Sequence, residues 1–143
     1  MAYGQMLMVL LAVILFSTVM MGYYNNLFRW YDIHNREFYR LQGLKVADKV
    51  FQQIEFQHLS SGVDFSGLYN NFQNFTSTIT IGPADYMINV QSAWCDSVGQ
   101  TSELPGLFIR FDVRIACIPE TQDTVWVGTS NFPLQKFVAN MGF

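Results

Sequence analysis

Hydrophobic residues follow two different patterns in the two ends of this chain. Residues 6–21, MLMVLLAVILFSTVMM, are apolar on every side and are interrupted only by Ser17 and Thr18. From Ile109 to Ile115, in contrast, apolar and polar residues alternate strictly. A continuous apolar run of this length is typical of a helix in lipid or in a protein core, whereas strict alternation is typical of a half-buried strand. The chain is therefore expected to begin as an apolar helix and to end as a sheet.

The apolar run is long enough to cross a membrane. A helix over residues 2–23 has roughly 20 residues, which at about 1.5 Å each spans a hydrocarbon core of about 30 Å. Aromatic side chains follow it, as in the aromatic belt at a membrane interface. They are Tyr23, Tyr24, Trp30 and Tyr31.

Two other interpretations of the run stay open. A buried core helix of this length normally carries a polar stripe, and none is present here. A cleaved signal peptide needs a basic start and a small-residue cleavage site, but nothing basic precedes Met6 and no A-x-A pattern follows Met21. Both interpretations are weaker than a membrane-spanning helix.

The charges that flank the run are all on one side. The first charged residue is Arg29, and Arg36, Arg40, Lys45 and Lys49 follow. The positive-inside rule would place this side in the cytoplasm, yet the later strand-rich, lysine-poor segment has the polar surface of an extracellular domain. A basic leader removed from the N-terminal side would resolve the conflict. Met1 is then expected to be the first residue of the mature protein.

An amphipathic helix is expected to continue the apolar one to about residue 58. The first proline is Pro83, and apolar residues recur at spacings of three and four. This stripe consists of Leu27, Tyr31, His34, Phe38 and Leu41, then Leu44, Ala47, Phe51 and Ile54. Helices tend to bend at glycine, so Gly22 and Gly43 are the expected bends. The second half of the helix is expected to cover a sheet.

The remaining segments predict an antiparallel sheet of four to five strands. Period-two patterns bounded by turn residues mark the strands. The expected strands are 75–81, 86–94, 107–117, 124–129 and a short fifth at 132–138, with a polar loop at 96–106. The fold class is α+β, divided into an apolar helix half (1–24), an amphipathic helix half (25–58), a linker (59–74) and a sheet domain (75–143).

Composition excludes several functions. Charged residues make up only 13% of the chain, against about 25% in typical soluble domains, and the net charge is −3. A nucleic-acid-binding surface of basic residues is therefore not expected. His34 and His58 lie at opposite ends of the amphipathic helix, and no zinc, phosphate-loop or catalytic-triad motif occurs. We expect neither an enzyme nor a bound metal or cofactor.

With these features the chain resembles a type IV pilin or a related pseudopilin. The features in common are an apolar start at Met1, an uncharged helix half, the glycine at Gly22, an amphipathic extension and a C-terminal sheet with a cysteine pair. The resemblance implies that a prepilin peptidase removes a basic leader and that the new N-terminus is methylated. It also implies a subunit held in the inner membrane until a pilus assembly machinery adds it to an extracellular filament.

One position departs from the family pattern. Pilins usually carry a glutamate where this chain has Gln5, and that glutamate is thought to pair with the amino terminus of a neighbouring subunit. Gln5 accepts a hydrogen bond but forms no ion pair, so the contact is weaker. Gln5, Ser17, Thr18 and Gly22 are the residues expected to act in assembly.

Two further sites concern covalent modification. Cysteines of an exported domain usually pair, so a Cys95–Cys117 disulfide is expected. If strands 86–94 and 107–117 form a simple hairpin, however, the two cysteines lie about 30 Å apart, and a bridge requires Cα atoms within about 7 Å. Asn74-Phe75-Thr76 is an N-glycosylation sequon.

The expected function is that of a structural subunit that polymerises with copies of itself through the apolar helix half. Two alternatives remain. The chain is a minor pilin or pseudopilin of a secretion or pilus machine, or it is a membrane-anchored protein with an extracytoplasmic binding domain.

Overall fold

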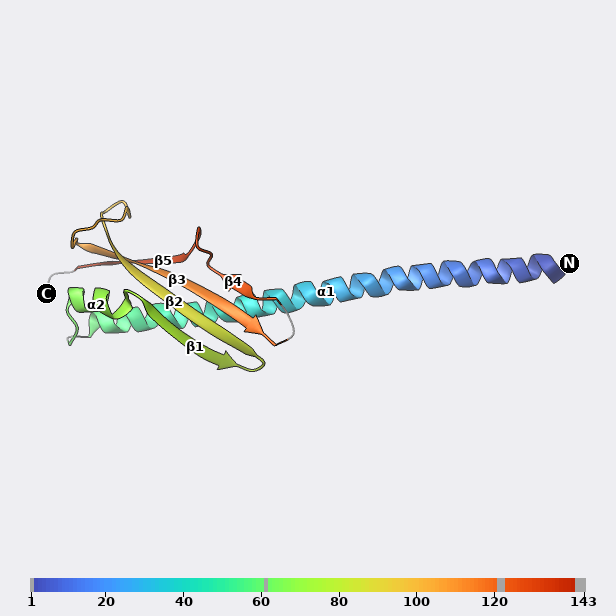
Figure 1. Ribbon diagram of the computed structural model, residues 1–143, viewed down its shortest axis with the longest axis horizontal. Helices are drawn as coiled ribbons and strands as arrows, with labels where there is room; N and C mark the ends of the chain where they lie inside the picture. Colours follow the sequence, from blue (N-terminus) through green and yellow to red (C-terminus); the bar gives the residue numbers. More distant parts are fainter. Residues whose placement is uncertain (1, 61, 121–122, 141–143) are drawn as a thin grey trace. The chain divides into compact units, whose positions relative to one another are not determined.

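A computed structural model of the chain describes residues 2–60, 62–120 and 123–140. The residues form two units, Met1–Phe38 and Tyr39–Phe143, which we describe separately. Helix α1, Ala2–Leu59, contributes its first part to one unit and its last part to the other. The remaining elements belong to the second unit (Figure 1). They are α2 (Phe65–Phe72), β1 (Phe75–Ile81), β2 (Ala84–Cys95), β3 (Phe108–Pro119), β4 (Val125–Val127) and β5 (Leu134–Ala139).

The five strands form one antiparallel sheet. Its order is β1-β2-β3-β4. β4 pairs with residues 115–117 of β3, and β5 pairs with residues 108–113 of the same strand. β2 and β3 are its longest pair, in register from Ala84 opposite Pro119 to Cys95 opposite Phe108. The predicted α+β class and the helix-on-sheet arrangement are confirmed. β1 has the expected bounds, and the bounds of the other four strands differ from those expected by one or two residues.

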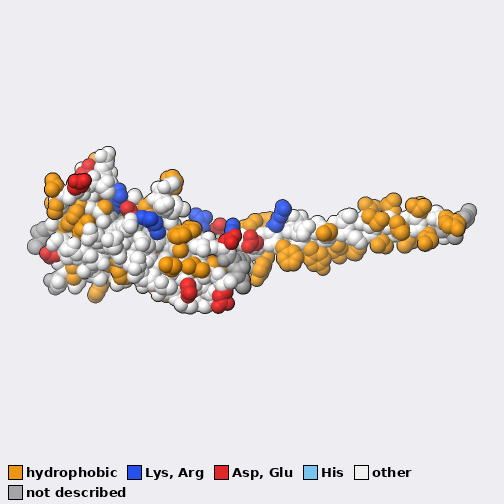
Figure 2. Space-filling view, in the orientation of Figure 1, with side chains coloured by type: hydrophobic (Ala, Val, Ile, Leu, Met, Phe, Trp, Pro, Cys, Tyr) orange, Lys and Arg blue, Asp and Glu red, His pale blue; other side chains and the backbone are white. Residues whose placement is uncertain are grey.

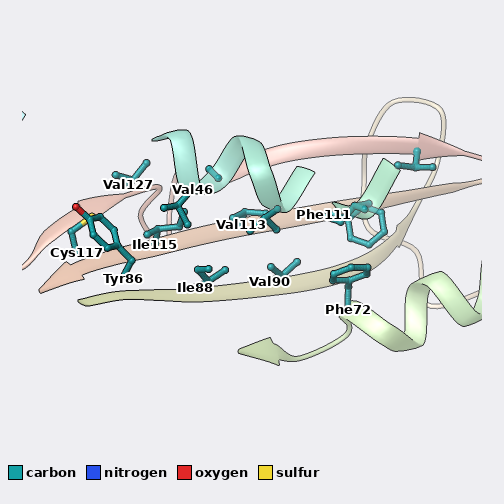
Figure 3. Close-up of a cluster of buried hydrophobic side chains, with 14 of the residues drawn as sticks. Val46, Phe72, Tyr86, Ile88, Val90, Phe111, Val113, Ile115, Cys117 and Val127 are labelled. Carbon is teal, nitrogen blue, oxygen red and sulfur yellow. The ribbon is translucent and has the colours of Figure 1, made fainter. Parts of the chain in front are cut away.

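The core lies between the sheet and the last part of α1 (Figure 3). Alternation along β3 buries Ile109, Phe111, Val113 and Ile115 completely, and the same pattern on β2 buries its apolar residues beside them. Leucine, isoleucine, valine and phenylalanine each add about 1.5–3 kcal/mol when fully buried, so this row stabilises the domain strongly. The expected orientation of β3 is confirmed.

The helix face that meets the sheet matches the expected stripe only in part, since Ala47 and Ile54 are buried and Phe51 packs against the core. Val46, Ala47, Val50 and Ile54 are buried, whereas Leu44 is 36% exposed. Gly43 explains the difference. A Cβ atom at Gly43 would lie 2.7 Å from Cγ2 of Val127 and 2.9 Å from Sγ of Cys117, so the helix backbone touches the sheet at this point. The residues at offsets of three, four, seven and eleven from Gly43 share its face.

Gly22 and Gly43, the expected bends, do not interrupt α1. The helix is continuous from Ala2 to Leu59. Glycine in a helix interior costs up to about 1 kcal/mol relative to alanine. At Gly43 this cost is offset by close packing, while at Gly22 a Cβ would meet nothing within 4 Å.

The segment expected as a linker, 59–74, contains helix α2. Asp64 is its N-cap and accepts a hydrogen bond from the backbone N–H of Gly67. The hydrogen bonds from Gly67 and Ser66 lower the pKa of Asp64. Leu68 and Phe72, four residues apart, are buried against the sheet. The pattern was too short, and too rich in glycine and asparagine, to indicate a helix.

The contact at Gly43 leads to a stability prediction. In Gly43→Ala the added methyl overlaps two buried side chains, and β-branched Val127 has little freedom to turn away. Overpacking costs about 1–3 kcal/mol and exceeds the gain of up to about 1 kcal/mol in helix propensity. We expect a lower thermal unfolding midpoint of the detergent-solubilised chain, followed by near-ultraviolet circular dichroism. Gly22→Ala is the matched control, because it brings the same gain in helix propensity without any overlap, and it should not lower the midpoint. An unchanged midpoint in Gly43→Ala would show that the contact is loose.

Candidate functional site

The first half of α1 exposes its apolar residues on all sides. Every large apolar side chain from Tyr3 to Tyr24 is at least 39% exposed, and no charged residue occurs before Arg29. Figure 2 shows these hydrophobic side chains along the helix. The helix is long and apolar enough to cross a membrane, and none of its most apolar stretch of 18 residues is buried. The core helix of a soluble domain would be mostly buried, so the exposure of this segment argues against that alternative. Length and apolar composition do not distinguish it from a signal sequence.

The two hydroxyl groups inside this apolar surface are already satisfied. Ser17 Oγ donates to the carbonyl oxygen of Val13 at 2.8 Å, and Thr18 Oγ1 lies within hydrogen-bond distance of the carbonyls of Ile14 and Leu15. Hydroxyl groups commonly bond back to the preceding helical turn in this way. The hydroxyl protons of Ser17 and Thr18 are therefore already used within the helix, and the expected part of these residues in assembly stays a prediction.

Gln5 differs from these two residues. Its amide lies on the exposed surface and bonds to no other side chain or backbone group that the structure describes. In lipid or in an apolar contact, an unpaired polar group costs about 1–3 kcal/mol. Gln5 is therefore the polar group of this surface that gains most from a partner outside the chain. Met1, the expected mature N-terminus, lies outside the described residues.

Exposed apolar side chains continue beyond the membrane-length segment. Trp30 is 71% exposed, Tyr31 67%, Phe38 51% and Leu41 58%. The sequence predicted that Tyr31, Phe38 and Leu41 belong to the stripe that covers the sheet, but the buried face begins only at Gly43. The helix therefore presents a further apolar and aromatic surface that its own domain does not bury. Tyr23 and Tyr24 meet edge to face, with ring centroids 6.3 Å apart.

The expected disulfide is absent. Cys95 and Cys117 are both free thiols and both buried. β2 and β3 form the simple hairpin that argues against a bridge, with Cys95 opposite Phe108 and Cys117 opposite Tyr86 at the other end. Nine strand residues, from 108 to 117, correspond to about 30 Å. The two sulfur atoms therefore belong to opposite ends of the sheet.

Each cysteine instead packs as a small apolar residue. Cys117 is fully buried, lies against Gly43 and donates weakly to the carbonyl oxygen of Tyr39. Burial raises the pKa of Cys117 to about 11 and also raises that of Cys95. Beside Cys117, the hydroxyl of Tyr86 donates to the side-chain oxygen of Gln42, and burial raises the pKa of Tyr86 to about 12. Figure 3 shows Cys117 and Tyr86 side by side.

The remaining candidate residues do not come together. His34 is exposed, and His58 packs edge to face with Phe65 at 6.1 Å. Within the described residues, no three histidine, cysteine or acidic side chains are close enough to hold a metal ion. Asn74 lies exposed in the turn before β1, where a glycan has room. Gly22 has open space around it.

Comparisons with known proteins add no assignment. No protein-family model matches the chain, and neither a curated protein nor a solved structure matches it. The resemblance to type IV pilins therefore stays a prediction from the sequence.

We predict that both thiols are free in the native protein and protected from reagents. Iodoacetamide at pH 8 should leave the folded chain unmodified, because neither sulfur is exposed and both are protonated. After unfolding in guanidinium without reductant, intact mass spectrometry should show two alkyl groups. Labelling that occurs only after reduction would show that Cys95 and Cys117 form a disulfide and would contradict the prediction.

A second prediction follows from the pKa of Cys117. Above about pH 9 the unfolded thiol loses a proton that the folded thiol keeps until about pH 11. The free energy of unfolding should therefore fall across this window, by at most about 1.4 kcal/mol per pH unit. Cys117→Ser should make the decline above pH 9 shallower and leave the parts due to Cys95 and Tyr86. Equal slopes in the two proteins would contradict this assignment.

Proposed function

We propose that this protein is the structural subunit of an extracellular helical filament, similar to a type IV pilus, and that it polymerises through the first half of α1. The observation that carries the proposal is the unequal use of that helix. Its last part has a sheet of its own to pack on, whereas its first half and the aromatic segment after it expose apolar side chains. Contiguous apolar surface of this extent indicates a lipid or protein partner.

This apolar surface would contact lipid before assembly and other copies of the helix in the filament. Before assembly, residues 2–24 span the inner membrane, and in the filament they pack among the same segments of neighbouring subunits. Burial from water does not drive the exchange, because lipid chains are as apolar as leucine. Close packing of side chains and satisfaction of Gln5 favour the filament. Since Ser17 and Thr18 are bonded within their own helix, neither group opposes either environment.

The segment from Trp30 to Leu41 also supports a polymer. A single membrane-spanning anchor needs an apolar surface only within the bilayer, but here exposed aromatic side chains extend several turns further toward the sheet domain. At such positions a lone subunit would expose them to headgroups or water, whereas a bundle of parallel helices would bury them. A repeated head-to-tail contact that does not close generates an open filament.

Composition of sheared surface fibres tests the proposal. Cells that produce the protein are sheared, and the released material is imaged and identified by mass spectrometry, with membrane-bound subunit as the control. Fibres made mainly of this chain are the expected result. Fibres that contain it as a trace component would favour a minor pilin or pseudopilin, and its confinement to the membrane would favour an anchored binding domain; either result overturns the proposal.

Substitutions of Gln5 test its place in the contact. Gln5→Leu keeps a similar volume and removes the unpaired polar group, so we expect insertion and polymerisation to persist. In Gln5→Lys a positive charge would approach the amino terminus of a neighbour. Two such charges about 4 Å apart cost about 4 kcal/mol at an effective dielectric of 20, so filament yield should fall at least roughly tenfold. Equal yields from Gln5→Lys and the parent would place Gln5 outside any subunit contact.

A further inference from the structure

A groove of about 500 Å³ crosses the sheet face turned away from α1. Its floor is one transverse row of the ladder, in which Thr78, Met87, Ala116 and Trp126 are successive partners on β1 to β4. Ala116 is only 6% exposed, although it faces outward, because Met87 and Trp126 flank it. These two larger side chains are themselves 51% and 57% exposed. The small residue between two large ones makes the hollow.

The next row of the ladder makes the groove basic. Asn89 and Arg114 are partners on β2 and β3, and both line the groove. Arg114 Nη2 donates to Oε1 of Gln91 at 2.7 Å, while Nε of Arg114 and Oδ1 of Asn89 lack hydrogen-bond partners among the described residues. The lining contains one guanidinium and no carboxylate. An apolar occupant with a nearby negative charge fits this surface.

The loop between β2 and β3, residues 96–107, has the complementary properties. Val98, Leu104 and Leu107 are 80%, 74% and 67% exposed. The loop carries the acids Asp96 and Glu103 and no lysine or arginine. Loops usually expose polar residues, so three exposed aliphatic side chains in one loop indicate a contact surface.

Hydrogen bonds hold this loop in one conformation. Asp96 Oδ1 accepts from the backbone N–H groups of Val98 and Gln100, both at 2.9 Å. Arg110 Nη1 donates to the carbonyl oxygen of Gly99 at 3.0 Å. A preordered loop loses less conformational entropy when it binds, which strengthens the contact.

Loop and groove of the same chain cannot meet. Met87 lies in the groove and Cys95 at the base of the loop, and the eight-residue step between them on β2 is about 26 Å. The groove lies at the end of the sheet where Gly43 touches Val127. The other end is where Glu55, a dozen residues further along α1, pairs with Lys136 of β5. Loop and groove therefore lie at opposite ends along the direction of the packed helix.

We propose that the 96–107 loop of one copy of this chain seats in the groove of the next copy. Leu104 packs on the floor formed by Met87, Ala116 and Trp126, and Glu103 approaches Arg114. The inference rests on the proposed filament, in which all helices are parallel, because parallel copies stacked along the helix direction bring one loop end to one groove end. The contact joins two different surfaces, so it repeats without closing. It gives the sheet domains an axial contact of their own, in addition to that of the apolar helices.

Cross-linking in sheared fibres tests the contact. Leu104→Cys combined with Met87→Cys changes two exposed residues and should fold normally. Mild oxidation of the fibres should produce a ladder of covalent multimers on non-reducing gels. The matched control combines Met87→Cys with Phe132→Cys. Phe132 is 81% exposed and lies outside both surfaces, so this pair should remain monomeric. The buried native thiols Cys95 and Cys117 are common to both proteins.

Substitutions measure how much the contact contributes. Leu104→Asp should lower fibre yield roughly tenfold, as expected for a central apolar anchor, whereas Phe132→Asp should leave it unchanged. If the parent forms fibres but the Leu104 and Phe132 variants behave alike in both assays, the loop contact is wrong and the filament stands. If the parent forms no fibres, the proposed function fails and this inference fails with it.

Discussion

The close approach of α1 to the sheet at Gly43 determines how the second unit of this protein is built. Without a side chain at that position, the helix backbone rests on Val127 and Cys117, and only one helix face can then point into the core. That face carries Val46, Ala47, Val50 and Ile54. Any side chain at residue 43 would lift the helix from the sheet and open space beneath these residues, and a protein core tolerates such voids poorly.

The same contact explains why so much of α1 is left without cover. Burial begins at residue 43 and ends near residue 54, about three helical turns. The remaining length of helix, apolar for its first half and aromatic after it, exposes these side chains. The proposed filament and the proposed contact between loop and groove both concern surfaces that the fold exposes and does not use.

The sheet separates its chemistry by face and by end. Alternation on β3 sends aliphatic and aromatic side chains to the helix, and Arg110, Asp112 and Arg114 to the opposite face. Arg110 and Asp112 pair there with Nε and Oδ1 at 3.1 Å, and Gln135 of β5 donates to the same carboxylate. The hairpin register keeps the two cysteines at opposite ends. Unpaired thiols are unusual in exported domains, and both thiols of this chain are buried.

Local pattern was sufficient to predict the apolar helix, the α+β class and the inward face of β3, because each depends on a period that neighbouring residues repeat. It was also sufficient to show that a simple hairpin would separate the cysteines. Four features were decided by tertiary structure. The buried helix face follows from Gly43, which has no side chain to contribute to a hydrophobic pattern. Helix α2 depends on packing of Leu68 and Phe72 against the sheet, since eight residues alone are too few to form a stable helix. The hairpin register excluded the disulfide. The groove exists because Met87, Ala116 and Trp126, far apart in sequence, become neighbours in one transverse row, and no local period encodes a row across three strands.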